Sequence, residues 1–182
     1  CEVKTIQDNS VVSTSTRPLL ESNSDIFVRF NQAVPILRRV QKFQEESFID
    51  LVSSQKPFGL PTNFRGNEVR KEGDIEVFQT KSTGYISRDK IRKSTELIDK
   101  YKLFISAGYG AGEEFPHQIL NKPLIGLPGS CCTETYILIG PFESLEILHN
   151  VKSYIQTKFF RFLVLLQKNT QHALKSVYTF VP

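Results

Sequence analysis

The spacing of apolar residues predicts a long helix in the N-terminal third of the chain. Apolar side chains recur at roughly helical intervals over residues 35–54, and the proline at position 35 suits the first turn of a helix. The Lys56-Pro57 step ends this helix, because the residue before a proline avoids the helical region. Upstream, the alternation over Ile26–Phe30 is typical of a strand, whereas residues 8–24 are polar and rich in Ser and Thr, which favours an irregular arm.

The middle of the chain predicts short strands joined by turns. Residues 75–80 alternate between apolar and polar side chains, and Lys81–Gly84 is typical of a turn that leads back into Tyr85–Ser87, so we expect a hairpin. A short helix is predicted over Ser94–Lys100. Further strands are predicted at Lys102–Ile105, Pro123–Gly126 and Cys132–Ile139.

The C-terminal third predicts one long amphipathic helix. Ser144 stands three residues before Ile147 and can cap the helix, and apolar side chains continue at helical spacing as far as Leu166. A closing strand is expected at Val177–Val181. The expected fold is mixed α/β and α+β-like: a mixed sheet with one long N-terminal helix and one long C-terminal helix, without regular βαβ alternation.

The composition supports one well-packed domain. Apolar residues make up 40% of the 182 residues, with 14 Phe and 6 Tyr, which is enough for a core and excludes a disordered chain. We expect this domain over residues 25–182, preceded by the irregular arm at 1–24. The chain begins at Cys1 and contains no Met, so we expect it to be a piece of a longer protein. No apolar run approaches the ~18 residues that span a bilayer, so a membrane is not an expected partner.

The patterns for catalysis and metal binding are weak. The three histidines lie far apart in sequence, and no CxxC pair or HxxxH spacing indicates a zinc site. The adjacent Cys131 and Cys132 are more typical of small, reduced, buried thiols than of a nucleophile. The glycine-rich loop at 106–112 follows a predicted strand, but it lacks the helix or the Lys-Ser/Thr pair that nucleotide-binding loops need.

Basic residues are more informative, because they gather in two places. The segment from Lys81 to Lys93 has five basic residues against one Asp. On the predicted C-terminal helix, Lys158, Arg161 and Lys168 fall within roughly 80° of one another and form one stripe. The net charge of +4 allows a nucleic acid as partner without requiring one. Two clusters nearly free of acidic residues favour contacts to phosphates.

Four stretches of the sequence resemble the C-terminal specificity region of bacterial restriction–modification adenine-specific DNA methyltransferases, including forms fused to an endonuclease. The resemblance runs from about Ser53 to Pro182, and the stretches follow in the expected order. They are SSQKPFGLPTNF (Ser53–Phe64), YKLFISAGYGAGEEFP (Tyr101–Pro116), KPLIGLPGSCCTETYILIGPFES (Lys122–Ser144) and TKFFRFLVLLQKNTQHALKSVYTFVP (Thr157–Pro182).

The resemblance implies a target recognition domain, which holds duplex DNA in register while the catalytic domain extrudes an adenine. The family's catalytic domain binds S-adenosylmethionine and grips the flipped base with an Asn/Asp-Pro-Pro-aromatic motif. This chain has no Pro-Pro, Asn-Pro or Asp-Pro step. We therefore expect it to be non-catalytic by itself, without a cofactor or metal of its own. Its implied partners are double-stranded DNA and the N-terminal methyltransferase domain of the same parent, in the bacterial cytoplasm.

Under this interpretation the candidate site residues fall into two groups. Phosphate contacts set affinity and salt dependence, whereas base contacts in the major groove set sequence choice. The candidates for phosphate contacts are Lys81, Arg88, Lys90, Arg92, Lys93, Lys158 and Arg161. The candidates for base contacts lie in the loops Lys56–Arg65 and Ser106–His117 and are Lys56, Asn63, Arg65, Tyr109 and His117.

Two alternatives remain open. In the first, the domain is a protein-interaction module: the FFRFLVLL segment docks on a methylase or nuclease lobe of the same parent, and the basic residues are ordinary solvated surface. In the second, the domain is a small thiol enzyme that uses Cys131 or Cys132.

Overall fold

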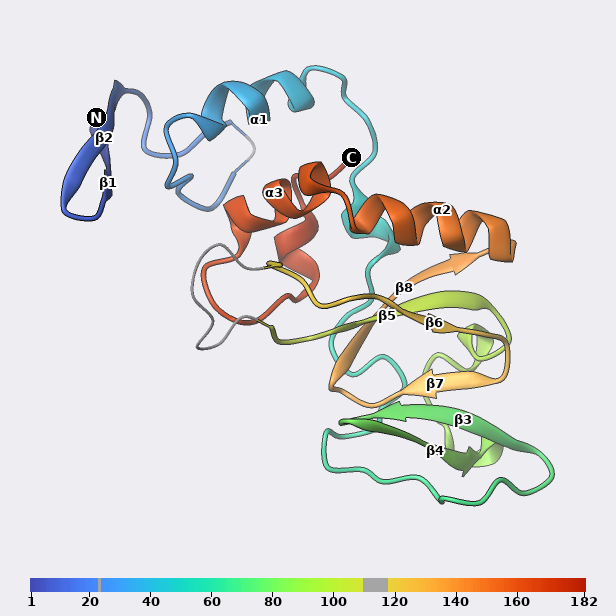
Figure 1. The fold of residues 1–182 in the computed structure, drawn as a ribbon. Coiled ribbons are helices and arrows are strands. Elements are labelled where there is room, and N and C mark those ends of the chain that lie inside the picture. The colour runs from blue at the N-terminus through green and yellow to red at the C-terminus, as the bar shows by residue number, and fades with distance from the viewer. Residues whose placement is uncertain (23, 110–117) are drawn as a thin grey trace.

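The structure, a computed structural model, describes residues 1–22, 24–109 and 118–182. Its body is layered: helices cover one face of a three-stranded sheet, and a second three-stranded sheet packs on the other face (Figure 1). The mixed, α+β-like fold predicted from the sequence is confirmed. The first sheet has the order β6 (Leu124–Gly126), β5 (Tyr101–Ser106), β8 (Tyr136–Phe142), and the second has the order β4 (Ser82–Ser87), β3 (Asp74–Gln79), β7 (Ser130–Cys132).

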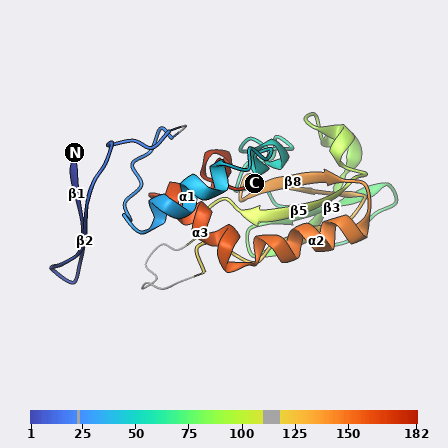
Figure 2. The same ribbon diagram turned by 90° about the horizontal axis from the view of Figure 1, so that it is seen from above.

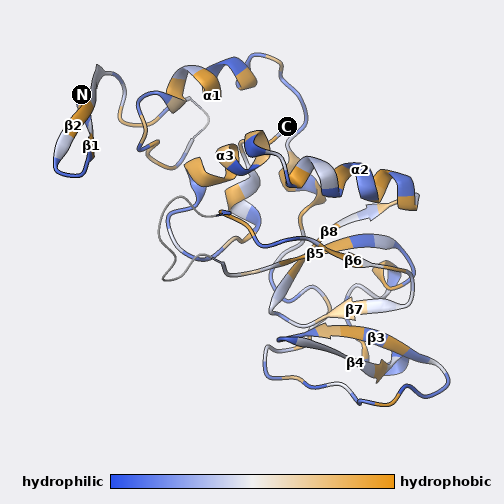
Figure 3. Cartoon of the chain, viewed as in Figure 1, coloured by the Kyte–Doolittle hydropathy of each residue, from blue (hydrophilic) through white to orange (hydrophobic). Residues whose placement is uncertain are grey.

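The alternation of side chains along β5 explains the layers. Successive side chains of a strand point to opposite faces, so one strand can serve two cores. Leu103 and Ile105 join the core beneath the helices, whereas Phe104 joins the core between the two sheets. β8 does the same with Ile137 and Ile139 against Leu138. In Figure 3, β3 and β5 carry hydrophobic colouring while the long loop beneath β4 is largely hydrophilic.

The hairpin predicted from the sequence is confirmed as β3–β4, but its turn was placed too late, at Lys81–Gly84. The antiparallel register pairs Gln79 with Ser82, so Thr80 and Lys81 form a two-residue turn and Ser82–Gly84 belong to β4. Lys81 has a φ of 65°, as tight hairpin turns require. The strand predicted at residues 132–139 is instead two strands, because residues 133–135 cross from one sheet to the other. β7 pairs with β3 in parallel and β8 pairs with β5 antiparallel.

The C-terminal helix is also divided. Helix α2 (Leu145–Ile155) and helix α3 (Lys158–Gln167) are separate, and Thr157 between them is extended, with φ −68° and ψ 151°. The predicted cap at Ser144 is present: its hydroxyl accepts a hydrogen bond from the Ile147 backbone N–H at 3.2 Å. The break redirects the chain so that Phe160 lies fully buried among the rings of Phe48, Tyr154 and Tyr178.

Replacing Thr157 by Ala should lower the free energy of unfolding by about 1 kcal/mol, because its hydroxyl caps α3. That oxygen accepts a hydrogen bond from the Phe160 N–H at 3.1 Å and donates to the Tyr154 carbonyl at 2.8 Å. Urea denaturation measures the loss, and Thr157→Ser is the matched control because it keeps the oxygen. Equal stability of the Ala and Ser variants would contradict the capping role.

The long N-terminal helix predicted over residues 35–54 was wrong. Helix α1 spans Ala33–Gln41, and a separate 3-10 helix, η1, spans Phe48–Leu51. Gln44 has a φ of 51°, which interrupts the helix. Tertiary contacts determine the path of the chain after α1. The Phe48 N–H donates to the Val181 carbonyl at 2.8 Å, so this part of the chain lies beside the C-terminal segment.

Three further predictions differ from the structure. Ile26–Phe30 lies outside the sheets, since its carbonyls bond to side chains: Arg17 donates to Val28 O and the Thr5 hydroxyl to Arg29 O. The segment predicted as a helix at 94–100 contains the 3-10 helix η3 (Thr95–Leu97), and the segment predicted as a strand at 177–181 begins inside the 3-10 helix η4 (Lys175–Tyr178). A further 3-10 helix, η2, spans Arg88–Lys90.

The N-terminal arm is a hairpin rather than an irregular segment. Strands β1 (Glu2–Gln7) and β2 (Ser10–Thr16) pair antiparallel around Asp8 and Asn9, which both have positive φ. The hairpin projects from the body beside α1 (Figure 2). Both of its faces are largely exposed, so its sequence lacks the apolar alternation that would have indicated strands. Within the described part of the chain, no helix is long and apolar enough to cross a membrane.

Candidate nucleic-acid interface

Strand β4 is the outermost strand of the second sheet, with its outer edge paired at one point, where Asn67 and Tyr85 exchange backbone hydrogen bonds at 2.8 and 2.9 Å. Exposed basic residues lie beyond both ends of the strand. Lys81 occupies the hairpin turn before the strand, and the segment Arg88–Lys93 follows it. Six strand residues at about 3.3 Å each separate the two groups by roughly 20 Å. We call Lys81 together with Lys90, Arg92 and Lys93 the β4 basic surface.

One buried side chain fixes the segment after β4. Ile91 is only 3% exposed and belongs to the core between the two sheets. Its neighbours on both sides point to solvent, so Lys90, Arg92 and Lys93 are all exposed. The local sequence, with one apolar residue inside a basic run, therefore anchors the backbone and displays the charges.

The two carboxylates near this segment are already engaged. Arg88 donates to Asp99 through both terminal nitrogens, one at 2.7 Å, and this bond raises the pKa of Arg88 and lowers that of Asp99. The Ser87 hydroxyl donates to Asp89 and lowers the pKa of that carboxyl. Among the described residues, Lys81, Lys90 and Arg92 form no salt bridge, although the charges of Arg92 and Lys90 also help to lower the pKa of Asp89. Arg88 alone in this segment is held by a direct bond to a carboxylate.

Three predicted base-contact residues flank the same sheet. The Lys93 ammonium donates to the Lys56 carbonyl at 3.3 Å, which places Lys56 beside the basic segment. Asn63 and Arg65 are exposed, and the Arg65 guanidinium donates to the carbonyls of its own loop, at 3.0 Å to Thr62 and 2.7 Å to Phe64. These residues lie on loops that pack against the second sheet.

Asn63 and Arg65 lie at the turn end of the hairpin. The Thr80 hydroxyl donates to the Thr62 carbonyl at 3.4 Å and shares a hydrogen bond with the Thr135 hydroxyl at 2.8 Å. The Thr135 carbonyl in turn accepts from the Ala107 N–H at 2.8 Å. Lys81, Asn63 and Arg65 therefore gather at the end of the two sheets where β5 also ends.

The remaining candidates lie beside the helices. The Tyr109 carbonyl accepts from Lys168 Nζ at 2.7 Å, and Arg161 donates to the Gln118 carbonyl at 2.8 Å. Partial burial lowers the pKa of Arg161. Lys158 is exposed at the start of α3. His117 falls outside the described residues.

The predicted stripe of Lys158, Arg161 and Lys168 on one helix was wrong for Lys168. This residue follows the end of α3 and is 7% exposed, since its ammonium turns inward to a carbonyl. The first sheet and its helices separate α3 from β4, as Figure 1 shows. The two basic clusters of the sequence therefore do not form one local patch.

The cysteines lie inside the core between the sheets. Cys131 and Cys132 are both 0% exposed. Burial raises the pKa of Cys131 to about 12 and raises that of Cys132 as well, so both thiols stay protonated at neutral pH. Nucleophilic chemistry at either would need this core to open. No group of three metal-binding side chains occurs in the part of the chain that the structure describes.

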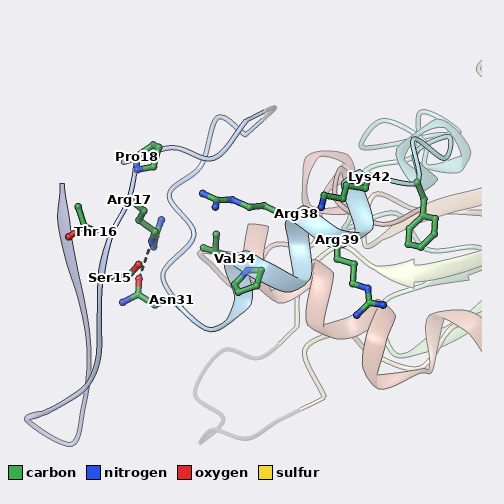
Figure 4. A pocket seen from close by; sticks show the side chains of 11 residues that line it. Ser15, Thr16, Arg17, Pro18, Asn31, Val34, Arg38, Arg39 and Lys42 are labelled. Carbon is green, nitrogen blue, oxygen red and sulfur yellow. Dashed lines mark hydrogen bonds between the residues drawn. The ribbon is translucent and has the colours of Figure 1, made fainter.

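Sequence reasoning missed a third basic group, on α1. Arg38, Arg39 and Lys42 lie on one side of this short helix and help to line a cleft of about 890 Å³ beside the N-terminal hairpin (Figure 4). Their spacing was visible in the sequence. The prediction for residues 35–54 rested on the apolar residues alone and assigned these basic residues no role.

Comparisons with protein-family models, with curated proteins and with solved structures gave no match for this chain.

Proposed function

We propose that this domain binds double-stranded DNA through the β4 basic surface, as the non-catalytic target recognition domain of a restriction–modification adenine DNA methyltransferase. The observation that carries the DNA-binding part is the display of exposed basic side chains, free of salt bridges among the described residues, beyond both ends of strand β4. The resemblance of the four sequence stretches supports the assignment to the methyltransferase family. In the proposed parent, S-adenosylmethionine and the reacting base belong to the catalytic domain.

The spacing of the basic side chains suits a duplex. The roughly 20 Å along β4 corresponds to about six base pairs of the duplex axis at 3.4 Å each. A duplex lying along β4 would meet Lys81 near one end and Lys90, Arg92 and Lys93 near the other. Asn63 and Arg65 at the turn, and Lys56 beside Lys93, would then be the closest candidates for base edges.

Fluorescence anisotropy with a mixed-sequence duplex of a few helical turns, repeated at several salt concentrations, tests this proposal. We expect dissociation constants of about 10⁻⁴ to 10⁻⁶ M at physiological salt. Three to four phosphate contacts predict a slope of log K against log salt of about −2.7 to −3.6. Absence of binding even at low salt would remove the β4 basic surface as a DNA-binding site.

Arg88→Ala should weaken duplex binding less than Arg92→Ala does. Arg88 already donates to Asp99 through two nitrogens, so it would have to leave that carboxylate to reach a phosphate. We expect a loss of about tenfold for Arg92→Ala and about threefold or less for Arg88→Ala. The same anisotropy titration measures both. A larger loss for Arg88 would mean that the ion pair opens when DNA binds.

A second candidate function is docking on a methylase or nuclease lobe of the same parent. Most apolar residues of α3, including Phe160, Leu163 and Leu166, are buried in the domain's own core. Phe159, however, is 41% exposed, and with the 70% exposed Phe43 it lines a groove of about 610 Å³ between α1 and α3. Exposed apolar surface of this kind is typical of an interaction site.

Phe43→Ser separates the two candidates. If the β4 basic surface carries DNA binding, this variant binds the duplex as the wild type does, since Phe43 lies just after α1 in the groove with Phe159 of α3, and the first sheet lies between these helices and β4. Charge reversal at Arg88, Arg92 and Lys93 should give the opposite result. A loss of duplex binding in Phe43→Ser would place the DNA at the helices instead.

A further inference from the structure

Arg65 lies in a loop, residues 61–67, whose backbone is fixed on both sides of this residue. Before it, the side chain of Phe64 packs against the core between the two sheets. After it, the Gly66 N–H donates to the side-chain oxygen of Gln79 at 2.8 Å, and Gln79 is only 5% exposed. Arg65 itself is exposed. The loop therefore displays this side chain from a fixed backbone.

The loop approaches strand β4 so closely that a side chain at position 66 would not fit. A Cβ on Gly66 would lie 2.7 Å from both the Tyr85 backbone nitrogen and Val77 Cγ1. The next residue, Asn67, pairs with Tyr85 on the outer edge of β4. In Figure 1 the loop beneath β4 runs on the side of the strand that faces away from the first sheet. Arg65 is thus held beside the strand along which the duplex is proposed to lie.

The guanidinium of Arg65 is bound to the protein through one nitrogen only. Its Nη1 donates to the Thr62 carbonyl at 3.0 Å and to the Phe64 carbonyl at 2.7 Å. Its Nε and Nη2 form no hydrogen bond with any residue that the structure describes. Because the group is planar, the two carbonyls restrict its orientation while the Nε and Nη2 donors stay available to a ligand.

The other arginines near β4 are held differently. Arg88 uses both terminal nitrogens on Asp99. The side chain of Arg92 forms no hydrogen bond within the described part of the chain, so its orientation is not fixed. Lysines are flexible point charges that suit phosphates, whereas the fork of an arginine recognises pairs of acceptors. Arg65 combines an oriented guanidinium with two adjacent free donors.

We propose that Arg65 reads a guanine in the major groove, by donating from Nε and Nη2 to the O6 and N7 acceptors of that base. The inference rests on the proposed function, duplex binding at the β4 basic surface. Guanine presents these two acceptors side by side, which matches the arginine fork. Adenine has an N–H donor beside its N7, cytosine presents a donor, and thymine has a methyl group beside its single acceptor. None of these three bases accepts both N–H groups.

Selection of duplexes from a pool of randomised sequence, with the full chain at low salt, tests the proposal. The wild type should enrich a guanine at one position, and Arg65→Ala should reduce this preference about tenfold or more. Arg70→Ala is the matched control, because Arg70 is an exposed arginine of the same connection between η1 and β3, and it should keep the preference. Arg65→Gln is a second variant: since glutamine pairs with adenine, the preference should move from guanine to adenine. Thermal unfolding verifies that each variant is folded.

A guanine analogue in which a C–H replaces N7 tests the contact itself. Placed at the enriched position, it should weaken binding by the wild type about tenfold and leave binding by Arg65→Ala unchanged. If Arg65→Ala instead weakens binding to all sequences alike and lowers the salt slope by about 0.9, Arg65 contacts a phosphate, and the proposal is overturned.

Two further results would also overturn it. One is a wild-type selection without a guanine preference, and the other is equal loss of that preference in Arg65→Ala and Arg70→Ala. In either case the duplex still binds, so the proposed function stands and only the reading by Arg65 fails. Failure of the proposed function has a different signature: no duplex of the pool binds, and both proposals fall together.

Discussion

Alanine at Lys90, Arg92 and Lys93 together is expected to lower duplex affinity by about 10²- to 10³-fold near physiological salt. Each of the three side chains is exposed and lies next to Ile91, whose burial fixes the backbone, so the variant should fold normally. Each lost phosphate contact removes about 0.9 from the slope of log K against log salt, so the slope should become smaller by about 2.7. Anisotropy titrations at several salt concentrations measure both changes.

The control for this variant is a triple alanine replacement of Lys4, Lys152 and Lys175. These lysines are at least partly exposed and lie on β1, α2 and η4, away from β4. Their removal changes the net charge by the same amount. If both triple variants lose affinity and slope equally, binding depends on net charge and not on the β4 basic surface.

Lys102→Met should change how the stability of the domain depends on pH. Lys102 is 0% exposed, and its ammonium donates to the carbonyls of Ile98, Lys100 and Leu127 at 2.9, 2.9 and 3.3 Å. Burial lowers the pKa of Lys102 from 10.5 to about 8. Between these two values the unfolded chain binds more protons than the folded chain, so this lysine makes the unfolding free energy rise with pH.

Urea denaturation at pH 7 and pH 9.5 measures the effect. Between the two pH values, the free energy of unfolding of the wild type should rise by about 2 kcal/mol more than that of Lys102→Met. The reason is that the buried ammonium loses its proton in the folded state. Below pH 8 both states hold the proton, and the full cost of the buried charge is present. The raised pKa of Cys131 acts in the opposite sense above pH 9, but that thiol occurs in both proteins. Lys100→Met, at an exposed position, is the control, and an equal response of the two variants would contradict the role of Lys102.

The parts of the fold that local patterns determine were predictable. The β3–β4 hairpin follows from alternation and a tight turn, and the Ser144 cap from a hydroxyl three residues before an apolar run. The pairing of β5 with β8 was less visible, because strands that serve two cores lack simple alternation. Leu103, Phe104 and Ile105 are consecutive and all 0% exposed, although they belong to different cores.

The errors arose where distant contacts override local preference. The helix predicted over residues 35–54 ends early because Phe48 pairs with the C-terminal segment and packs against Phe160 and Tyr178. The helix predicted through Leu166 breaks because Thr157 caps a new one. Both errors also affected the candidate site. The helix predicted over residues 35–54 did not separate the basic side of α1 as a group of its own. The C-terminal helix predicted as continuous placed Lys168 on a basic stripe to which it does not belong.

The central claim is that β4 and its basic flanks face the DNA, and backbone amide chemical shifts recorded during titration with a duplex test it most directly. We expect the shifted amides to lie at Lys81, along the strand to Ser87 and on to Lys93. In the Lys90/Arg92/Lys93 alanine variant, the size of these shifts should no longer depend on the salt concentration. Unshifted amides over residues 81–93 at a saturating duplex concentration would contradict the claim, whatever the affinity measured in bulk.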